Sequence, residues 1–596
     1  MEYKTRAEVP NEFKWDLSKM YNDFKDIEKD INEVESLTPQ ILEYKSHIMD
    51  NSKTLYDFLK LSEKQDRIIT KLYVYSKMNL DVDTKDNKSK ALKMRIEKIN
   101  EVLSEKYSFI EPEMLETDYD TVLKYVKENK SLKEYKFYLE TIFRFKPHSL
   151  SLKEEEIYAK ALNAMGNCDE VFSNINNSDI DLGTIKDEDG NEVELTSSNY
   201  QIFMKSKNRQ VRIDAFNGMY GYYKSLKNTL AASLVGEIKE SAFVTNVKKY
   251  NSTLERSLFQ DNIDVSVYDN LIENIHNHMN LMYDYMELRR KILGLDQIHM
   301  YDIYVDLVDS DNNNIPFEEG KKILFEALKP LGDKYLKDLN KAFEEKWIDI
   351  YPSSGKRSGA YSWGCYDSYP YLLLNYNDTL DAVSTMGHEL GHSMHSYYSK
   401  SQNYVDSNYP IFLAEIASTV NEVLINDYMY KNAKTDKEKI VYLTDFLDSV
   451  RTTIYRQTMF AEFEKIMHEK EQKGIPLTEE EISNTYYELN KLYYGDGVVS
   501  DDNIRYEWSR IPHFYTPFYV YKYATGLSSA LSIASRILKG DIETRDNYLK
   551  FLSSGGSDYP LNILNKVGVD MTTSKPIEEA LDMFKERLEE LKKIAN

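Results

Sequence analysis

Residues 353–395 join a glycine-punctuated stretch to a helical run that carries two histidines. The segment YLLLNYN (371–377) is typical of a short apolar strand, and TMGHELGHSMH follows it closely. Within that run His388, Glu389 and His392 stand in the order H-E-x-x-H. Helical spacing places the two histidines one turn apart on one face, where two imidazoles can bind a single zinc ion. The sequence therefore predicts a strand, a helix and a metal site in close succession.

Two further features favour a metal site over a helix that carries two histidines by chance. With 10 histidines in 596 residues, a chance H-E-x-x-H is uncommon. Glu389 can accept a proton from a water whose pKa zinc lowers to roughly 7. Gly387 and Gly391 each cost a helix about 1 kcal/mol relative to Ala. We therefore expect another backbone or a substrate to approach closely at these glycines.

A third protein ligand is expected on the next helical segment. The long pattern H-E-x-x-H-x-x-G-x-x-H is excluded, because Tyr398 holds its third histidine position. The stretch FLAEIASTVNEVLINDYM (412–429) supplies Glu415 and Glu422, seven residues apart and hence on one face. An apolar stripe predicted to pack this helix inward consists of Phe412, Ile416, Val420 and Val423. Because an unpaired glutamate on a packed face is costly, we expect Glu415 to bind the metal and Glu422 to steady a ligand histidine. The alternative is that one or both are solvated edge residues.

The rest of the chain predicts a mainly α protein. Breakers are few, with 22 Gly and 14 Pro, and good helix formers dominate between them. The main interruption is IKDEDGNEVELTSSN (185–199), where Asp189-Gly190 between two short alternating segments indicates a β-hairpin. We place a domain boundary near residue 200, giving an N-terminal helical domain (1–199) and a catalytic domain (200–596).

Charge and cysteine usage bound the cellular context. A net charge of −23 argues against nucleic-acid binding, which needs clustered Lys and Arg. Cys168 and Cys365 are the only cysteines, which fits a reducing cytosol. The charged N-terminus lacks an apolar targeting segment, and no apolar run reaches membrane-spanning length. We expect a cytoplasmic protein without membrane partners. The sequence leaves the oligomeric state open.

HELGHSMH followed by FLAEIASTVNE resembles the M3 family of zinc metallopeptidases, and its oligoendopeptidase F branch in particular. The stretches KWDLSKMY (14–21), GKRSGAYSWGCYDSYPYLLLNYNDTL (355–380) and IPHFYTPFYVYKYATG (511–526) agree, so the resemblance spans nearly the whole chain. It implies a large helical ellipsoid with a deep substrate channel and a small zincin-like β-sheet beside the H-E-x-x-H helix. It also implies that short peptides enter the channel and folded proteins do not.

The resemblance implies one Zn2+ per chain and a role for each matching residue. His388, His392 and Glu415 match the metal ligands, Glu389 the general base, and His513 a histidine over the substrate. A tyrosine that hydrogen-bonds the developing oxyanion follows that histidine. The candidates are Tyr515, Tyr519, Tyr521 and Tyr523; we favour Tyr519 and expect Tyr515 and Tyr523 to bind substrate.

Substrate contacts are also expected from the glycine-rich stretch and the strand before the motif. We expect Gly359 and Tyr376 to contact substrate, strand 371–377 to pair with an extended peptide, and residues 355–364 to form a flexible rim. The leading hypothesis is a zinc endopeptidase that cleaves internal bonds of short unstructured oligopeptides. A zinc carboxypeptidase of similar build and a non-catalytic metal-dependent peptide-binding protein are the alternatives.

Overall fold

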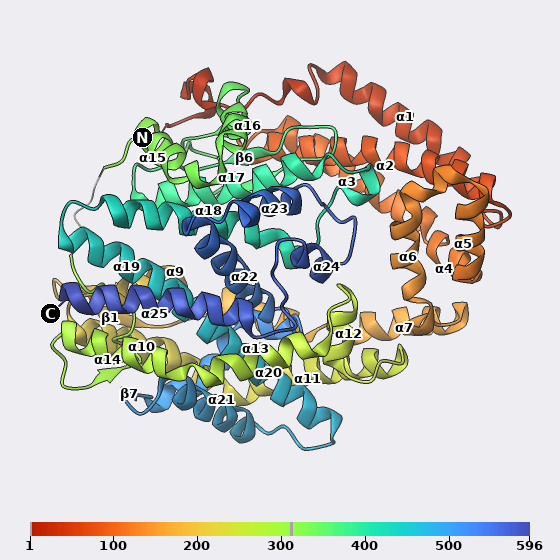
Figure 1. Cartoon of the computed structure of the whole chain (residues 1–596). Helices are drawn as coiled ribbons and strands as arrows, with labels where there is room; N and C mark the ends of the chain where they lie inside the picture. Colours follow the sequence, from red (N-terminus) through yellow and green to blue (C-terminus); the bar gives the residue numbers. More distant parts are fainter. Residues whose placement is uncertain (1–2, 310–313, 596) are drawn as a thin grey trace. The chain divides into compact units, whose positions relative to one another are not determined.

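The computed structural model describes residues 3–309 and 314–595, most of which lie in α-helices (Figure 1). The chain divides into two compact units, each built from three segments. Unit 1 contains Met1–Ser149, Asn312–Tyr428 and Arg536–Gly568, and unit 2 contains Leu150–Asp311, Met429–Ser535 and Val569–Asn596. The boundary near residue 200 assumed two consecutive domains, and it stays a prediction.

Unit 1 combines helices with one three-stranded sheet. Its helices are α1 (Phe24–Leu42), α2 (Ser52–Asp81), α3 (Asn87–Tyr107), α4 (Ile110–Leu115), α5 (Tyr119–Glu128), α6 (Lys136–Arg144), α15 (Phe317–Ala327), α16 (Asp333–Glu344), α17 (Leu380–Ser399), most of α18 (Ile411–Asn432), α23 (Ile542–Leu552) and α24 (Pro560–Asn565). Its strands are β4 (Ile348–Asp349), β5 (Tyr361–Trp363) and β6 (Tyr371–Leu373). Helix α1 buries Ile27, Ile31 and Val34 at helical spacing, as an amphipathic helix does.

The sheet of unit 1 has the strand order β4-β6-β5. Strand β4 pairs with β6 in parallel and β5 pairs with β6 in antiparallel register, with Ser362 opposite Leu372. All three residues of β6 are buried, which their apolar side chains favour in a strand covered on both faces. Helix α17 packs against β5 and β6, so the predicted sheet beside the H-E-x-x-H helix is confirmed. The strand is shorter than the predicted 371–377.

In its described residues, unit 2 combines helices with two small two-stranded sheets. Its helices are α7 (Leu152–Met165), α8 (Cys168–Asn177), α9 (Ser197–Met204), α10 (Arg209–Ser225), α11 (Lys227–Val247), α12 (Thr253–Phe259), α13 (Val265–Asn277), α14 (Met279–Ile292), α19 (Asp436–Val450), α20 (Arg456–Gln472), α21 (Glu479–Tyr494), most of α22 (Tyr521–Leu538) and α25 (Lys575–Ala595). Its strands are β1 (Thr184–Lys186), β2 (Glu192–Glu194), β3 (Ile298–His299) and β7 (Val498–Val499). Strands β1 and β2 form the predicted hairpin, with Gly190 at φ +83°.

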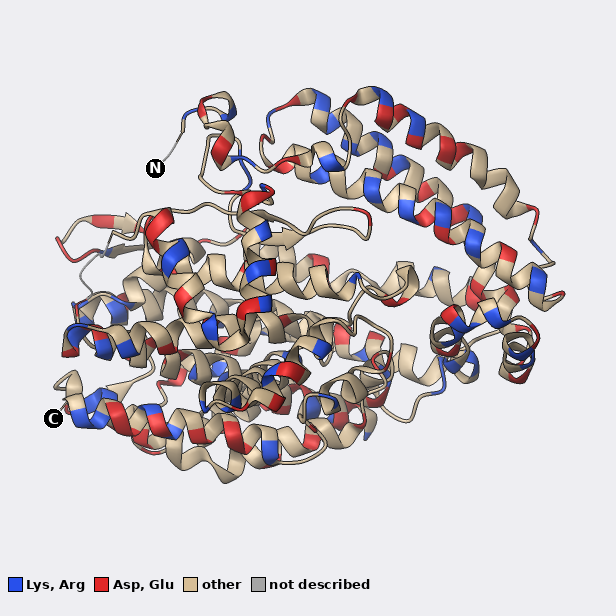
Figure 2. Ribbon diagram, turned by 45° about the horizontal axis from the view of Figure 1, so that its top comes forward, with Lys and Arg blue, Asp and Glu red and all other residues tan. Residues whose placement is uncertain are grey.

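The helices carry charged residues of both signs. Figure 2 shows that Lys and Arg residues are interspersed with Asp and Glu residues along many helices, although the net charge is −23. In the residues that the structure describes, none of the helices combines the length and apolarity needed to cross a membrane.

Candidate active site

Helix α17 carries the H-E-x-x-H motif and begins at a capped end. Thr379 precedes the helix, and its hydroxyl accepts a hydrogen bond from the backbone N–H of Ala382. His388 and His392 follow Thr379 by nine and thirteen residues. They lie on one face of the helix, with their Nε2 atoms 3.1 Å apart. Two neutral imidazole nitrogens this close can present their lone pairs to one cation.

Helix α18 brings Glu415 to the same point. Its Oε2 lies 3.5 Å from Nε2 of His388 and 3.4 Å from Nε2 of His392. Ligands held about 2.0–2.1 Å from a tetrahedral zinc stand about 3.3–3.4 Å apart, so these three atoms match the size and donor chemistry of such a centre. Within residues 3–309 and 314–595, this group of His and Glu side chains can hold a metal ion.

Glycines allow α17 and α18 to approach each other closely. A Cβ atom on Gly391 would lie 2.5 Å from the Cα of Ser418, so only glycine fits against that backbone. The amide of Asn421 on α18 donates a hydrogen bond to the carbonyl of Gly387 (3.0 Å). A side chain on Gly387 would instead meet the flexible end of Ile425. The predicted close approach of another backbone is therefore confirmed at Gly391.

Glu422 contacts the Nδ1 edge of the His388 ring. Its Oε1 lies 3.0 Å from Nδ1 of His388. Because a carboxylate only accepts hydrogen bonds, Nδ1 carries the proton and Nε2 is left free to face Glu415 and His392. The predicted apolar stripe of α18 is buried, but the side chains of Glu415 and Glu422 are 48% and 39% exposed. Our premise that both glutamates lie on a packed face was therefore wrong.

Burial and neighbouring charges shift the pKa values of these side chains. Burial raises the pKa of Glu389, which is 8% exposed, while His388 and His392 oppose that rise. The hydrogen bond from His392 lowers the pKa of Glu415. For His388, burial favours a lower pKa, but the hydrogen bond to Glu422 and the negative charges of Glu422, Glu389 and Glu415 together outweigh it, so the net shift of the pKa is upward. Glu389 is thus a buried carboxyl beside the imidazoles of His388 and His392.

Strand β5 lies next to the motif helix. The Ser362 and Ser393 hydroxyls are 2.7 Å apart, which ties the middle of β5 to the residue after His392. Strand β6 has β4 on one side and β5 on the other, so its backbone groups are already paired. Our prediction that the 371–377 strand pairs with substrate was therefore wrong. Among the described residues, β5 is the edge strand of this sheet that packs against α17.

Tyr376 and Gly359 occupy different surroundings. The Tyr376 side chain is 1% exposed, its hydroxyl donates to the carbonyl of Ile315 (2.9 Å), and its ring packs edge-on against Phe317. That is the position of a core residue. Gly359 has φ +81°, and its carbonyl accepts a hydrogen bond from the Asn375 amide (2.7 Å). Substrate contact at Gly359 stays a prediction.

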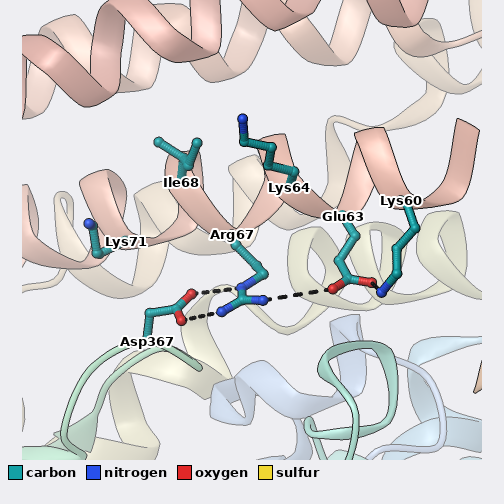
Figure 3. Close-up of a pocket in the computed structure, with 7 residues that line it drawn as sticks. All are labelled: Lys60, Glu63, Lys64, Arg67, Ile68, Lys71 and Asp367. Atoms are coloured by element: carbon teal, nitrogen blue, oxygen red, sulfur yellow. Dashed lines mark hydrogen bonds and ion pairs between the residues drawn. The ribbon is translucent and has the colours of Figure 1, made fainter. Parts of the chain in front are cut away.

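Helix α2 supports the β5–β6 hairpin along much of its length, which the sequence did not predict. Arg67 binds Asp367 in the hairpin loop through two hydrogen bonds, one of 2.9 Å, and lies 3.8 Å from Glu63 (Figure 3). Toward the end of α2, Asp81 accepts a hydrogen bond from the Tyr361 hydroxyl (3.0 Å) at the start of β5. The sequence offers no short-range signal for these pairs, because Arg67 and Asp367 are 300 residues apart.

Unit 2 brings three of its predicted site residues together. The Nε2 of His513 lies 3.1 Å from the Tyr523 hydroxyl. The ring of Tyr519 lies 6.2 Å from that of His513 and 5.5 Å from that of Tyr523. Burial, with a smaller contribution from Arg456, lowers the pKa of His513, so its imidazole is neutral at pH 7. These three side chains form a cluster of hydrogen-bonding groups.

The two other tyrosines of this region have packing roles. The ring of Tyr515 stacks on Phe172 with centroids 4.5 Å apart. Tyr521 is fully buried at the start of α22. The structure thus separates Tyr519 and Tyr523, which surround His513, from Tyr515, whose ring lies against α8.

Comparison with known proteins defines the class. The chain matches the profile of Peptidase family M3 over residues 202–583 and that of the Oligopeptidase F N-terminal region over residues 113–181. The chain therefore belongs to peptidase family M3 and is a metalloendopeptidase. The resemblance inferred from the motifs is confirmed.

Individual relatives agree over nearly the full length. Oligopeptidase PepF of Bacillus subtilis is 41% identical over 590 residues, covering 99% of this chain and 88% of the relative. The plasmid-encoded oligoendopeptidase F of Lactococcus lactis subsp. cremoris is 39% identical, covering 99% and 98%. The crystal structure of oligoendopeptidase F from Enterococcus faecium is 34% identical with a TM-score of 0.74, covering 96% and 99%. The crystal structure of a peptidase from Chlamydophila abortus is 36% identical with a TM-score of 0.94, covering 99% of this chain and 100% of that chain.

Proposed function

We propose that this chain is a cytoplasmic zinc-dependent oligoendopeptidase that hydrolyses internal bonds of short, unstructured peptides. The observation that carries the proposal is the convergence of the Nε2 atoms of His388 and His392 with Oε2 of Glu415, within 4.8 Å of one another, beside buried Glu389. The names of the relatives, oligoendopeptidase F and oligopeptidase, support the choice of oligopeptides as substrates. The net charge of −23 supports a role without nucleic-acid or membrane partners.

His388, His392 and Glu415 are the proposed ligands of one zinc ion per chain. When bound, zinc supplies Lewis-acid polarisation of the scissile carbonyl and lowers the pKa of a bound water to about 7. Glu422 keeps His388 in the tautomer that leaves its Nε2 free, as the 3.0 Å contact to Nδ1 indicates. Glu389 accepts a proton from the attacking water and delivers it to the leaving amine.

Two groups of the chain are proposed to act on the peptide itself. The edge strand β5 pairs with the extended substrate by backbone hydrogen bonds, which give affinity without strong sequence selectivity. His513 and Tyr519 donate hydrogen bonds to the carbonyl oxygen as negative charge develops on it, and Tyr523 orients His513. An uncharged imidazole, as its lowered pKa implies, donates one such bond and keeps its other nitrogen for a partner.

The test compares wild type with Glu389→Gln on end-blocked, quenched fluorescent peptides of increasing length, with bound zinc quantified by mass spectrometry. We expect both proteins to hold about one zinc and Glu389→Gln to lose about 10²–10⁴-fold in kcat. Asp381→Asn, an exposed residue in the first turn of the same helix, is the matched control and should retain full activity.

Three outcomes would overturn parts of the proposal. Zinc without turnover in wild type would identify a metal-dependent peptide-binding protein. Failure to cleave the end-blocked peptides, with cleavage of the same peptides carrying a free C-terminus, would identify a carboxypeptidase. Equal activity of Glu389→Gln and wild type would remove Glu389 as the base.

A further inference from the structure

The segment between His513 and Tyr523 contains a strained backbone turn at Phe518. Phe518 has φ +58°, in the left-handed region that side chains other than glycine rarely adopt. Its own side chain is 1% exposed, so the turn is not a solvent-facing bend. A left-handed phenylalanine persists only where surrounding groups hold it.

Glu464 on α20 holds this turn from inside the protein. Its Oε1 accepts a hydrogen bond from the backbone N–H of Phe518 at 3.0 Å, and the side chain is 3% exposed. Its Oε2 is buried and has no hydrogen-bond partner among the residues that the structure describes. Burial raises the pKa of Glu464 well above its usual range, although the hydrogen bond from Phe518 opposes that rise. Burying a carboxyl group of which only one oxygen is hydrogen-bonded costs free energy. This cost argues that the contact with the strained turn has a function.

Neighbouring contacts fix the two sides of the turn. Before it, the carbonyl of Pro517 accepts a hydrogen bond from the Ser257 hydroxyl (3.0 Å). After it, the Lys522 ammonium binds Asp261 at 2.7 Å. The ring of His468, one turn along α20 from Glu464, lies 4.8 Å from the Phe518 ring. These contacts hold the segment on both sides of the Phe518 N–H, whose hydrogen bond Glu464 accepts.

The turn sets the direction of the next side chain. Tyr519 follows Phe518 directly, and its ring lies within 6.2 Å of the His513 ring and 5.5 Å of the Tyr523 ring. If Phe518 left the left-handed region, the chain direction would change at Tyr519. The hydrogen-bonding cluster of His513, Tyr519 and Tyr523 therefore depends on the conformation of one residue outside it.

We propose that Glu464 is a positioning residue, which orients the Tyr519 hydroxyl by hydrogen-bonding the left-handed turn at Phe518. The inference rests on the proposed function, in which Tyr519 stabilises the developing oxyanion. In this role Glu464 acts through the backbone of Phe518 and not by contact with the substrate.

The test is a double-mutant cycle between Glu464→Met and Tyr519→Phe, with kcat, KM, bound zinc and thermal midpoint measured for each variant. Met matches the length of Glu and removes the acceptor. We expect Glu464→Met to lower kcat by about 10- to 100-fold, the range that misplacement of a group by about 1 Å produces. We expect KM to change by less than about threefold and zinc content to stay the same. In the Tyr519→Phe background the Glu464 substitution should have almost no further effect on kcat.

Conservative variants and a matched control protect the result against misfolding. Glu464→Gln retains an acceptor for the Phe518 N–H and should rescue kcat to within about twofold of wild type. Glu464→Asp retracts the acceptor by one methylene and should lower kcat even if Glu464→Met does not fold. Glu462→Met is the control, since Glu462 lies on the same helix but accepts from the Tyr493 hydroxyl (2.8 Å) instead of the turn. It should leave kcat unchanged.

The outcomes that overturn the inference are distinct from those that overturn the proposed function. Additive losses in the cycle, equal losses in the Glu462 control, or full activity of both Glu464→Met and Glu464→Asp would overturn the role of Glu464 alone. Full activity of Tyr519→Phe would remove the proposed role of Tyr519 and this inference together.

Discussion

The two clusters of hydrogen-bonding side chains in this protein are built in contrasting ways. In unit 1, the His388, His392 and Glu415 side chains project from two regular helices that meet through Gly391. In unit 2, His513 projects from a short 3-10 helix (Pro512–Tyr515), and Tyr519 projects from the irregular backbone just before α22, where Phe518 adopts a left-handed conformation. The first arrangement follows from helical periodicity, whereas the second depends on individual backbone angles and on buried partners.

This difference has consequences for chemistry and stability. A pair of packed helices keeps its shape without help from a ligand, so three metal-binding atoms can be held ready in advance. A strained turn keeps its shape only through contacts such as that from Glu464, so its geometry is easier to lose. Substitutions in the two regions should therefore separate metal binding from turnover.

The largest effect is expected from removing a proposed metal ligand. His392→Ala deletes one of three converging atoms, so zinc content and peptide cleavage should both fall to background. The helical circular dichroism of this variant should remain, because α17 and α18 pack through Gly391 and through the Asn421–Gly387 hydrogen bond. Chelator treatment of wild type should have the same result, with activity restored by added zinc.

His47→Gln is the control for the ligand variant. His47 is exposed in unit 1 and pairs with Asp50 on the surface. It should retain zinc and full activity. Loss of helicity in His392→Ala would show instead that the metal is needed to fold the helix pair.

The next largest effect is expected in unit 2 and without metal loss. Tyr519→Phe removes one proposed donor to the oxyanion, so kcat should fall by about 10²–10³-fold. Zinc content should not change, because no metal-binding residue has been altered. Tyr515→Phe is the matched control, since the Tyr515 ring stacks on Phe172 and should influence kcat little. If Tyr515→Phe lowers kcat more than Tyr519→Phe does, Tyr515 and not Tyr519 is the donor to the oxyanion.

The same contrast explains what the sequence could predict. The i, i+4 spacing of His388 and His392 and the seven-residue spacing of Glu415 and Glu422 follow directly from helix geometry, and the structure brings all four side chains together. The close approach at Gly391 could also be predicted, since glycine is costly inside a helix.

Other features depend on long-range packing and have no local pattern. Strand β6 is central in its sheet because it pairs with both β4 and β5. The compositions of these strands do not encode that pairing. The contact of Arg67 with Asp367 joins segments 300 residues apart. Phe518 adopts a left-handed conformation that phenylalanine rarely takes, and a hydrogen bond to buried Glu464 stabilises it. Local propensity therefore predicts a different backbone conformation at this residue.

A smaller effect, confined to metal affinity, is expected for Glu422. Glu422→Gln replaces the carboxylate that accepts from Nδ1 of His388 by a neutral amide. Zinc affinity should fall by about 10- to 100-fold, while kcat of the zinc-saturated enzyme should change much less. Competition with a zinc-binding dye measures the affinity, and activity at saturating zinc measures kcat. Unchanged affinity would mean that Glu422 does not steady the ligand histidine.

The smallest effect distinguishes the two glycines of α17. Gly391→Ala places a Cβ 2.5 Å from the Cα of Ser418 and 2.7 Å from the carbonyl oxygen of Ala417, and a backbone cannot move aside as a side chain can. We expect this variant to lose about 1–3 kcal/mol of stability and part of its zinc affinity, as α17 and α18 are forced apart. Gly387→Ala meets only the flexible end of Ile425, and alanine gains about 1 kcal/mol in helix propensity, so its stability should stay close to wild type. Urea unfolding of the zinc-free proteins measures the difference. Equal stability of the two variants would mean that side-chain packing, and not the contact between backbones, sets the distance between the metal-binding helices.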